Sequence, residues 1–186
     1  YDWEAMKEEH YAWWIARFRK LYKLVDVVRI DHFRGFESYW EIDGKAKTAI
    51  NGRWLPGPGK PFFDAVKAAL GSLPVVAEDL GIITDEVEKL RDDCGFPGMK
   101  VLHFTLYFND RGRIGFVAPE NSVIYTGTHD NNTTVGWYTS DINDATRAGV
   151  AQLIGADREN PQDVAAKLIR FAYASRARLA IVPMQD

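Results

Sequence analysis

The sequence predicts an α/β fold in which parallel strands alternate with helices. Helix-periodic segments and short β-branched runs follow one another along the chain, and this order favours crossover connections between parallel strands. An apolar fraction of 46% and a charged fraction of 26% are typical of a globular protein. The 186 residues are too few for a whole (β/α)8 barrel of about 250 residues. Two architectures remain, an open doubly wound sheet and about five-eighths of a barrel.

The first half of the chain contains three expected helices and two expected strands. Tyr11, Trp14 and Phe18 recur at three- and four-residue spacing and predict a helix over residues 4–24. The β-branched run 25–30 predicts a buried strand, and a Gly- and Pro-rich loop is expected to follow it, through residues 51–59. Pro61 and Thr84 fit the starts of the next two helices. The remaining expectations are a helix over 61–71, a strand over 74–77 and a helix over 84–95.

The second half contains three expected strands and two expected helices. Asn160 followed by Pro161 is typical of a helix start, with the asparagine as the cap. The expected strands are 99–104, 123–126 and 179–182, and the expected helices are 141–154 and 161–177.

Composition excludes several classes of protein. The chain has 23 Lys and Arg against 26 Asp and Glu, so no basic excess favours nucleic acid or an anionic membrane. No apolar run approaches the roughly 20 residues of a membrane span. Cys94 is the only cysteine, which excludes an internal disulfide framework and favours a reducing compartment. No Gly-rich phosphate loop and no Gly-x-Ser-x-Gly motif is present, and the adjacent His-Asp pairs do not favour a metal site.

Polar residues collect directly after three of the expected strands. Asp31 follows the first strand, Glu78 the second and Asp130 the fourth. In a barrel the carboxyl ends of all strands open on one face, where active sites lie, so these three carboxylates are expected around one cleft. The alternative is that each is a helix cap or a surface charge, with Asp31 simply paired to Arg29 or Arg34.

Longer motifs around these residues resemble the 4-α-glucanotransferases, also called amylomaltases, which are glycoside hydrolase family 77 of the α-amylase superfamily. The segments that carry the resemblance span essentially the whole chain. They are Arg29-Ile-Asp-His-Phe-Arg-Gly-Phe36, Ala77-Glu-Asp-Leu-Gly81, Pro97-Gly-Met-Lys-Val-Leu102, Thr128-His-Asp-Asn-Asn-Thr133 and Val182-Pro-Met-Gln-Asp186. The resemblance implies a partial (β/α)8 TIM barrel with about the last five strands and their helices.

The resemblance also implies roles for the strand-end residues. Asp31 would be the nucleophile, Glu78 the general acid/base and Asp130 the third carboxylate, which grips sugar hydroxyls. Arg29 would orient Asp31 in its ionised form, and His129 would hydrogen-bond the sugar in the reacting subsite. A retaining exchange of this kind passes through a covalent glycosyl-enzyme and requires carboxyl groups about 5 to 5.5 Å apart.

The same resemblance implies substrates and a setting. The partners would be maltooligosaccharides or other α-1,4-glucans with glucose as an acceptor, with no cofactor, metal, nucleic acid or membrane, in the cytoplasm; the oligomeric state stays open. Trp54, Phe104 and Asn131 are further candidates for substrate binding. The alternative for Trp54 is a buried ring that anchors its loop, and core packing is the favoured alternative for Phe104. The family pattern implies glutamine where this chain has His103.

The resemblance further implies that residues 1–186 are the C-terminal portion of a (β/α)8 catalytic domain, without its N-terminal strands and its extreme C-terminus. We therefore expect the chain to have little activity by itself. Two alternatives stay open: an α-glucan hydrolase of the same superfamily, and a non-catalytic glucan-binding module.

Overall fold

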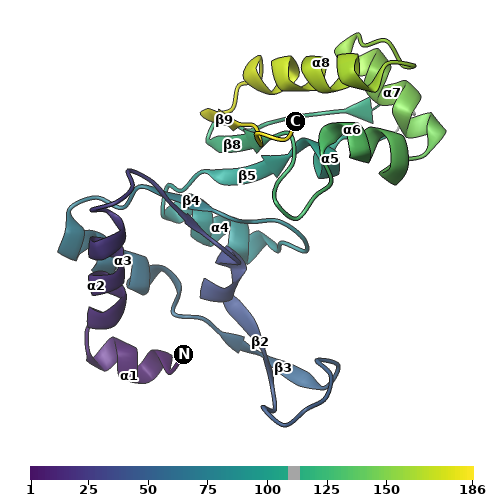
Figure 1. Cartoon of the computed structure of the whole chain (residues 1–186). Helices are drawn as coiled ribbons and strands as arrows, with labels where there is room; N and C mark the ends of the chain where they lie inside the picture. Colours follow the sequence, from purple (N-terminus) through teal and green to yellow (C-terminus); the bar gives the residue numbers. More distant parts are fainter. Residues whose placement is uncertain (109–113) are drawn as a thin grey trace. The chain divides into compact units, whose positions relative to one another are not determined.

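The computed structural model describes residues 1–108 and 114–186, which form two compact units, residues 1–98 and 99–186. Helices and parallel strands alternate along the chain as the sequence predicts (Figure 1). The parallel strands are β1 (Val28–Ile30), β4 (Val75–Ala77), β5 (Gly98–Val101), β8 (Ser122–Tyr125) and β9 (Leu179–Ile181). The boundary between the units falls inside β5, after its first residue.

The first unit begins with two helices, α1 (Trp3–Glu8) and α2 (Ala12–Leu21), so the prediction of one helix over 4–24 is wrong. His10 and Tyr11 adopt left-handed backbone conformations, with φ of 52° and 55°, which a continuous α-helix does not allow. The Tyr11 ring is 5% exposed and packs edge-on against Phe62 at 5.2 Å. Burial of this ring accompanies the break in the helix.

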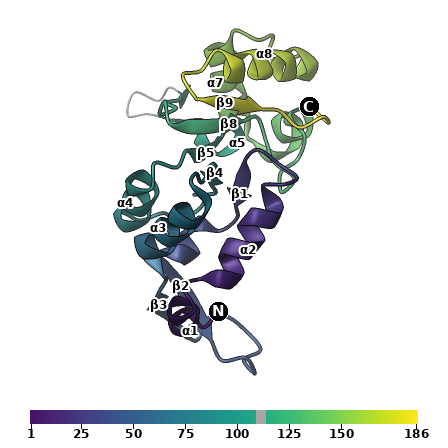
Figure 2. The ribbon, with the colours of Figure 1, turned by 90° about the vertical axis from the view of Figure 1, so that its left-hand side faces the viewer.

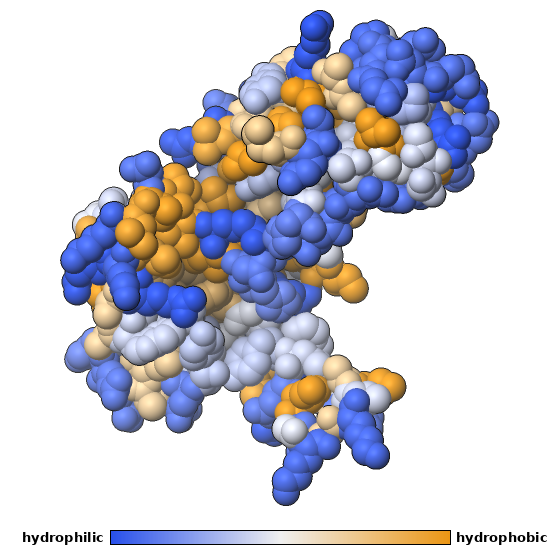
Figure 3. All heavy atoms as spheres, viewed as in Figure 1, coloured by the Kyte–Doolittle hydropathy of each residue, from blue (hydrophilic) through white to orange (hydrophobic). Residues whose placement is uncertain are grey.

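Parallel pairing in the first unit aligns the strand ends that carry the candidate residues. Val28 lies opposite Val75 and Ile30 opposite Ala77, and β4 in turn pairs with β5 through Ala77 and Gly98. The predicted strand over 25–30 is too long, because β1 begins at Val28 and Val25 is 45% exposed. Figure 3 shows hydrophobic residues gathered where α2 leads into β1.

Two further helices complete the packing of the first unit, α3 (Gly59–Leu70) and α4 (Asp85–Asp93). Figures 1 and 2 both show α2 beside α3. The core between these helices and the strands is rich in aromatic rings, because phenylalanines from the helices meet those of the short 3-10 turn η1 (Phe33–Phe36). The buried phenylalanines are Phe18, Phe33, Phe36, Phe62, Phe63 and Phe96.

The segment predicted as a loop contains an antiparallel hairpin, β2 (Ser38–Ile42) and β3 (Gly52–Pro56), so that prediction is wrong in part. Trp40 lies opposite Trp54 in its register. The high Gly and Pro content of the segment predicts a loop and gives no strand signal. The hairpin forms nevertheless, because two strands can pair their backbones with few buried residues. In Figure 1 the hairpin extends away from α1 and α3.

The second unit pairs β8 with β9 in parallel, with Val123 opposite Leu179. Helices α7 (Asp144–Ile154) and α8 (Pro161–Tyr173) begin after the side-chain caps Asn143 and Asn160, so the predicted helix over 141–154 starts too early and the one over 161–177 ends too late. The predicted strand over 99–104 is too long, because a single helical turn, α5 (Leu102–Thr105), follows β5. The remaining elements are β6 (Tyr107–Phe108), β7 (Ile114–Gly115), α6 (Thr134–Gly136) and the π-helical turn η2 (Trp137–Asp141).

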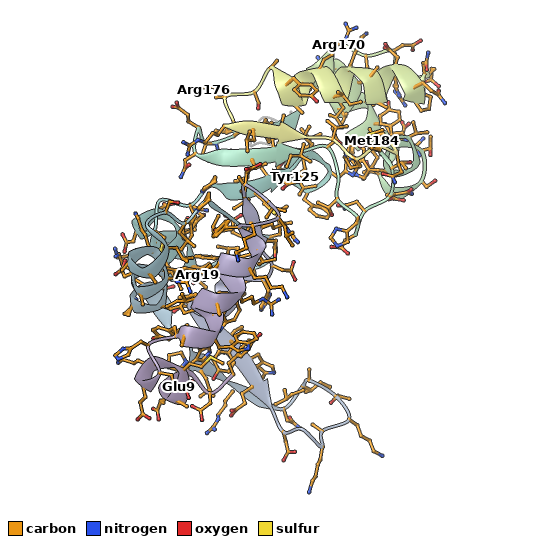
Figure 4. The ribbon with its side chains drawn as sticks, turned by 60° about the vertical axis from the view of Figure 1, so that its left-hand side comes forward. Glu9, Arg19, Tyr125, Arg170, Arg176 and Met184 are labelled. Atoms are coloured by element: carbon orange, nitrogen blue, oxygen red, sulfur yellow. The ribbon has the colours of Figure 1, made fainter. Side chains whose placement is uncertain are left out.

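The core of the second unit lies between α8 and the strands β8 and β9. Ile124, Val164 and Leu168 are fully buried there, and the labelled Arg170 of α8 points away from the strands in Figure 4. Within the described residues, no helix has the length and apolar character that crossing a membrane requires.

Candidate active site

Arg29 and Asp31 form an ion pair at the end of β1. Arg29 Nη2 lies 2.9 Å from Asp31 Oδ1, and the Asp31 side chain is 77% exposed. The pair lines one side of a pocket of about 220 Å³ whose apolar wall comes from α2, including Trp14 and Phe18. The structure therefore presents the Asp31 carboxylate to solvent beside a guanidinium.

Glu78, directly after β4, is held by the backbone of two turns. Its Oε2 accepts a hydrogen bond from the His32 amide at 2.7 Å, and its Oε1 accepts one from the Leu80 amide at 2.8 Å. The Glu78 backbone also bonds to Ile30 and Phe33, which flank Asp31 in sequence. The parallel ladder thus continues past the strands and brings the turns of Asp31 and Glu78 together.

Asp79, the residue after Glu78, is held by an ion pair to α4. Asp79 is 6% exposed, and its Oδ2 lies 2.5 Å from Arg91 Nη1 of α4. Burial by itself lowers the pKa of Arg91, but hydrogen bonds to Asp79 and Asp92 outweigh it and raise this pKa. The Asp79 carboxylate fits against Gly98, where a Cβ atom would lie 2.9 Å from Asp79 Cγ. Sequence analysis missed this anchor because Asp79 and Arg91 are twelve residues apart and belong to different elements.

Trp54 is 53% exposed on β3, so the alternative of a buried anchor is wrong. Its ring meets Trp40 edge-on at 5.5 Å, and Arg34 Cζ lies 4.5 Å from the ring centroid. The cation–π contact links the hairpin to the turn after β1. This arrangement leaves aromatic surface available for stacking.

In the second unit, the segment after β8 carries three of the predicted residues. His129 Nε2 lies 3.4 Å from Asp130 Oδ2, and both side chains are 75% exposed. Asn131 turns inward, since its Oδ1 accepts hydrogen bonds from the Thr128 amide at 3.0 Å and from Thr128 Oγ1 at 2.8 Å. Asn131 therefore shapes the turn, while His129 and Asp130 face solvent.

Phe104 and His103 follow β5 and differ in their surroundings. Phe104 is 59% exposed, so the expectation that it packs in the core is wrong. His103 is 8% exposed and stacks on Trp137 with ring centroids 4.5 Å apart. His103 Nε2 lies 3.1 Å from Thr134 Oγ1. Burial lowers the pKa of His103 to about 4, although the charges of Asp186 and Asp141 act in the opposite direction.

The predicted site residues divide between the two units. Arg29, Asp31, Trp54 and Glu78 belong to the first unit, and Phe104, His129, Asp130 and Asn131 belong to the second. The first unit pairs Arg29 with Asp31 and holds the Glu78 carboxylate on the amide of His32, the residue after Asp31. The convergence of Asp130 on Asp31 and Glu78 stays a prediction. Among the described residues, no three His, Cys, Asp or Glu side chains have an arrangement that could hold a metal ion.

Parallel strands that alternate with helices and carry polar residues at their carboxyl ends are typical of (β/α)8-barrel proteins, and the solved structures compared below place the chain in this class, here in partial form. The chain belongs to the 4-alpha-glucanotransferase family, whose sequence model matches residues 1–186. It is 51% identical to the 4-alpha-glucanotransferase of Streptococcus pneumoniae and 52% identical to that of Synechocystis; each alignment covers 100% of this chain and 37% of the relative. The chain therefore spans little more than a third of the length of these relatives.

Solved structures agree with this assignment. The amylomaltase from Streptococcus agalactiae in complex with acarbose matches 100% of this chain and 37% of its own, with a TM-score of 0.89 and 36% identity. The amylomaltase from Corynebacterium glutamicum has a TM-score of 0.75 at 16% identity over 95% of this chain and 30% of its own, which supports the fold alone. The predicted partial barrel and the family resemblance are confirmed.

Proposed function

We propose that this chain carries the catalytic carboxylates of a 4-alpha-glucanotransferase, which transfers α-1,4-glucan segments between maltooligosaccharides or to glucose. The observation that carries the proposal is the pair of interlocked turns that present Asp31 beside Arg29 and hold Glu78 by the His32 amide. Membership of the family along residues 1–186 supports the same activity. The acarbose complex of the Streptococcus agalactiae amylomaltase supports an oligosaccharide ligand.

In the proposed first step, the Asp31 carboxylate attacks the anomeric carbon and forms a covalent glycosyl-enzyme. Glu78 donates its proton to the departing glycosidic oxygen, so the bond to the leaving glucan breaks as the bond to Asp31 forms. Arg29 pairs with the Asp31 carboxylate and orients it before attack. Asp130 grips sugar hydroxyls and favours the distorted transition state, and His129 donates a hydrogen bond to the sugar.

In the second step, a hydroxyl group of another glucan attacks the same anomeric carbon. Glu78, now ionised, accepts the proton of that hydroxyl, and Asp31 leaves with its electron pair. The nucleophile and the proton donor are both carboxyl groups of the chain, so the proposed reaction needs neither a nucleotide nor a metal. Transfer exceeds hydrolysis where an acceptor sugar is held in line and water is poorly placed. The exposed rings of Trp54 and Phe104 are the proposed platforms for such sugars.

The proposal also covers the metabolic role and the cellular compartment of the protein. We place the activity in starch, glycogen or maltose metabolism in the cytoplasm, and the presence of a single cysteine, Cys94, supports a reducing compartment.

The deciding experiment is Glu78→Gln in a full-length protein that contains this chain, with maltotriose as the substrate. We expect turnover to fall by about 100- to 10,000-fold because the proton donor is lost, while maltooligosaccharide binding remains. Glu8→Gln, which changes an exposed glutamate of α1, is the matched control and should leave turnover unchanged.

The wild-type product pattern separates the alternatives. A ladder of oligomers longer than maltotriose supports transfer, whereas shorter products alone indicate a hydrolase. Binding without any turnover in the wild-type protein indicates a glucan-binding module and contradicts the proposal.

A further inference from the structure

The segment between β8 and α6 begins and ends at buried threonines. Thr126 and Thr134 are both fully buried, while the segment between them presents His129 and Asp130 with side chains 75% exposed. Packing therefore does not fix the two exposed side chains, and their positions depend on the backbone of residues 126–134. In Figure 4 the labelled Tyr125 marks the end of β8, from which this segment leaves.

Asp186 binds both ends of this segment. Its Oδ2 accepts hydrogen bonds from Thr126 Oγ1 at 2.5 Å and from Thr134 Oγ1 at 2.9 Å. Its Oδ1 accepts a third hydrogen bond from the Thr134 amide at 2.7 Å. Hydrogen bonds to a charged carboxylate are stronger than those between neutral groups, so Asp186 ties the two ends together.

His103 adds one more hydrogen bond to these contacts, at Thr134. Thr134 Oγ1 uses its hydrogen toward Asp186, so it accepts from His103, whose proton must lie on Nε2. His103 Nδ1 is buried without a hydrogen-bond partner among the described residues, and a Cβ atom on Gly127 would lie 3.0 Å from it. The neutral ring thus packs against the first residues of the segment while it supports Thr134.

Between its ends the segment is stiffened from within. Asn131 Oδ1 accepts from the Thr128 amide and hydroxyl, and the Asn131 amide donates to the Thr128 carbonyl at 3.1 Å. Thr133 Oγ1 accepts from the Gly136 amide and caps the start of α6. A stiff segment that is fixed at its two ends moves as one body, so a change at Asp186 reaches His129 and Asp130.

We propose that Asp186 is a positioning residue that clamps Thr126 to Thr134 and so sets the orientation of His129 and Asp130 toward the sugar. The inference rests on the proposed function, because it concerns residues of that reaction. Asp186 touches neither His129 nor Asp130 through a described hydrogen bond or ion pair, and it acts through the backbone between the two threonines.

The test is Asp186→Ala in the full-length protein, with kcat and KM measured separately on maltotriose. We expect kcat to fall by about 10- to 100-fold, because a misplacement near 1 Å at the reacting sugar has effects of that size. KM should change by much less, since the lost interactions act mainly in the transition state. Asp163→Ala is the control: Asp163 of α8 also accepts a backbone hydrogen bond, from Asp157 at 2.7 Å, and pairs with Lys167, but it lies outside the segment.

A second pair of variants keeps the test decisive if Asp186→Ala does not fold. Thr134→Val removes the hydroxyl at nearly constant shape and should lower kcat several-fold. Thr134→Ser retains the hydroxyl and should keep kcat near the wild-type value. An unchanged kcat in Asp186→Ala, or equal losses in the valine and serine variants, would overturn the inference. A wild-type protein without transfer products would contradict the proposed function instead.

Discussion

At the residue scale, His103 shows how burial selects a protonation state. Its ring lies parallel to Trp137, with an interplanar angle of 9°, and burial lowers its pKa to about 4. The unfolded chain holds the same imidazole near its ordinary pKa of about 6.5. Between these two values the unfolded state binds a proton that the folded state does not bind.

Protonation of His103 should therefore destabilise the protein in mild acid. The free energy of unfolding is unaffected by this group above about pH 6.5 and falls by up to about 3 kcal/mol as the pH decreases toward 4. His103→Gln removes the titration while its amide still donates to Thr134. Urea unfolding at pH 7 and pH 5 should show a smaller pH dependence in this variant than in the wild type, and equal pH dependence would contradict the argument. His10→Gln, at an exposed position, is the control.

The sequence singles out Asp31 and Glu78 because each directly follows a strand, and Asp130 because it lies in the polar segment that follows β8. Arg91 gave no such signal, and Asp186 entered only as part of a segment that carries the family resemblance. Their roles come from contacts across long stretches of chain, from Asp186 to Thr126 and from Arg91 to Asp79, which no local pattern encodes. The inward turn of Asn131 comes from hydrogen bonds to Thr128, three residues before it.

At the element scale, the sequence predicted the five parallel strands and the helices α3, α4, α7 and α8, and missed the short or irregular elements. Hydrophobic spacing continues through His10 and Tyr11, so the break between α1 and α2 has no periodic signal. The hairpin β2–β3 and the π-helical turn Trp137–Asp141 were missed because few of their residues alternate between core and solvent. Tertiary contacts decide such elements, as the packing of Trp137 on His103 illustrates.

The ion pair that joins the β4–α4 turn to its helix should contribute strongly to stability. Arg91→Ala leaves the Asp79 carboxylate, whose side chain is 2% exposed, without its arginine, and we expect the free energy of unfolding to fall by about 3 to 5 kcal/mol. Lys89→Ala on the same helix removes an exposed pair with Asp93 and should cost only about 0.3 to 0.5 kcal/mol. Chemical denaturation measures the free energy of unfolding of both variants. Similar decreases would show that the buried pair stabilises the protein no more than the exposed one.

At the scale of the whole molecule, the chain is a family member that spans about 37% of the length of its relatives. Its two compact units each contain their own aromatic or aliphatic core and their own share of the candidate residues. The proposed reaction needs groups from both units to meet one sugar.

The 186-residue chain assayed alone should therefore have less than about one-hundredth of the transfer activity of a full-length relative, because rate depends steeply on how well the reacting groups are placed. Product ladders from maltotriose, measured at equal molar concentrations of the two proteins, provide the comparison. Turnover near that of the intact relative would contradict this expectation.

Transfer of the candidate site to another barrel would require two segments of this chain to be moved together, the turn after β1 and the turn after β4. The turn after β1 supplies the His32 amide, whose left-handed backbone, with φ of 49°, orients the donor, and the turn after β4 supplies the accepting carboxylate of Glu78. Exchange of either turn alone replaces one partner of this hydrogen bond and leaves the other behind. The turns after β1 and β4 are therefore one unit for any such exchange.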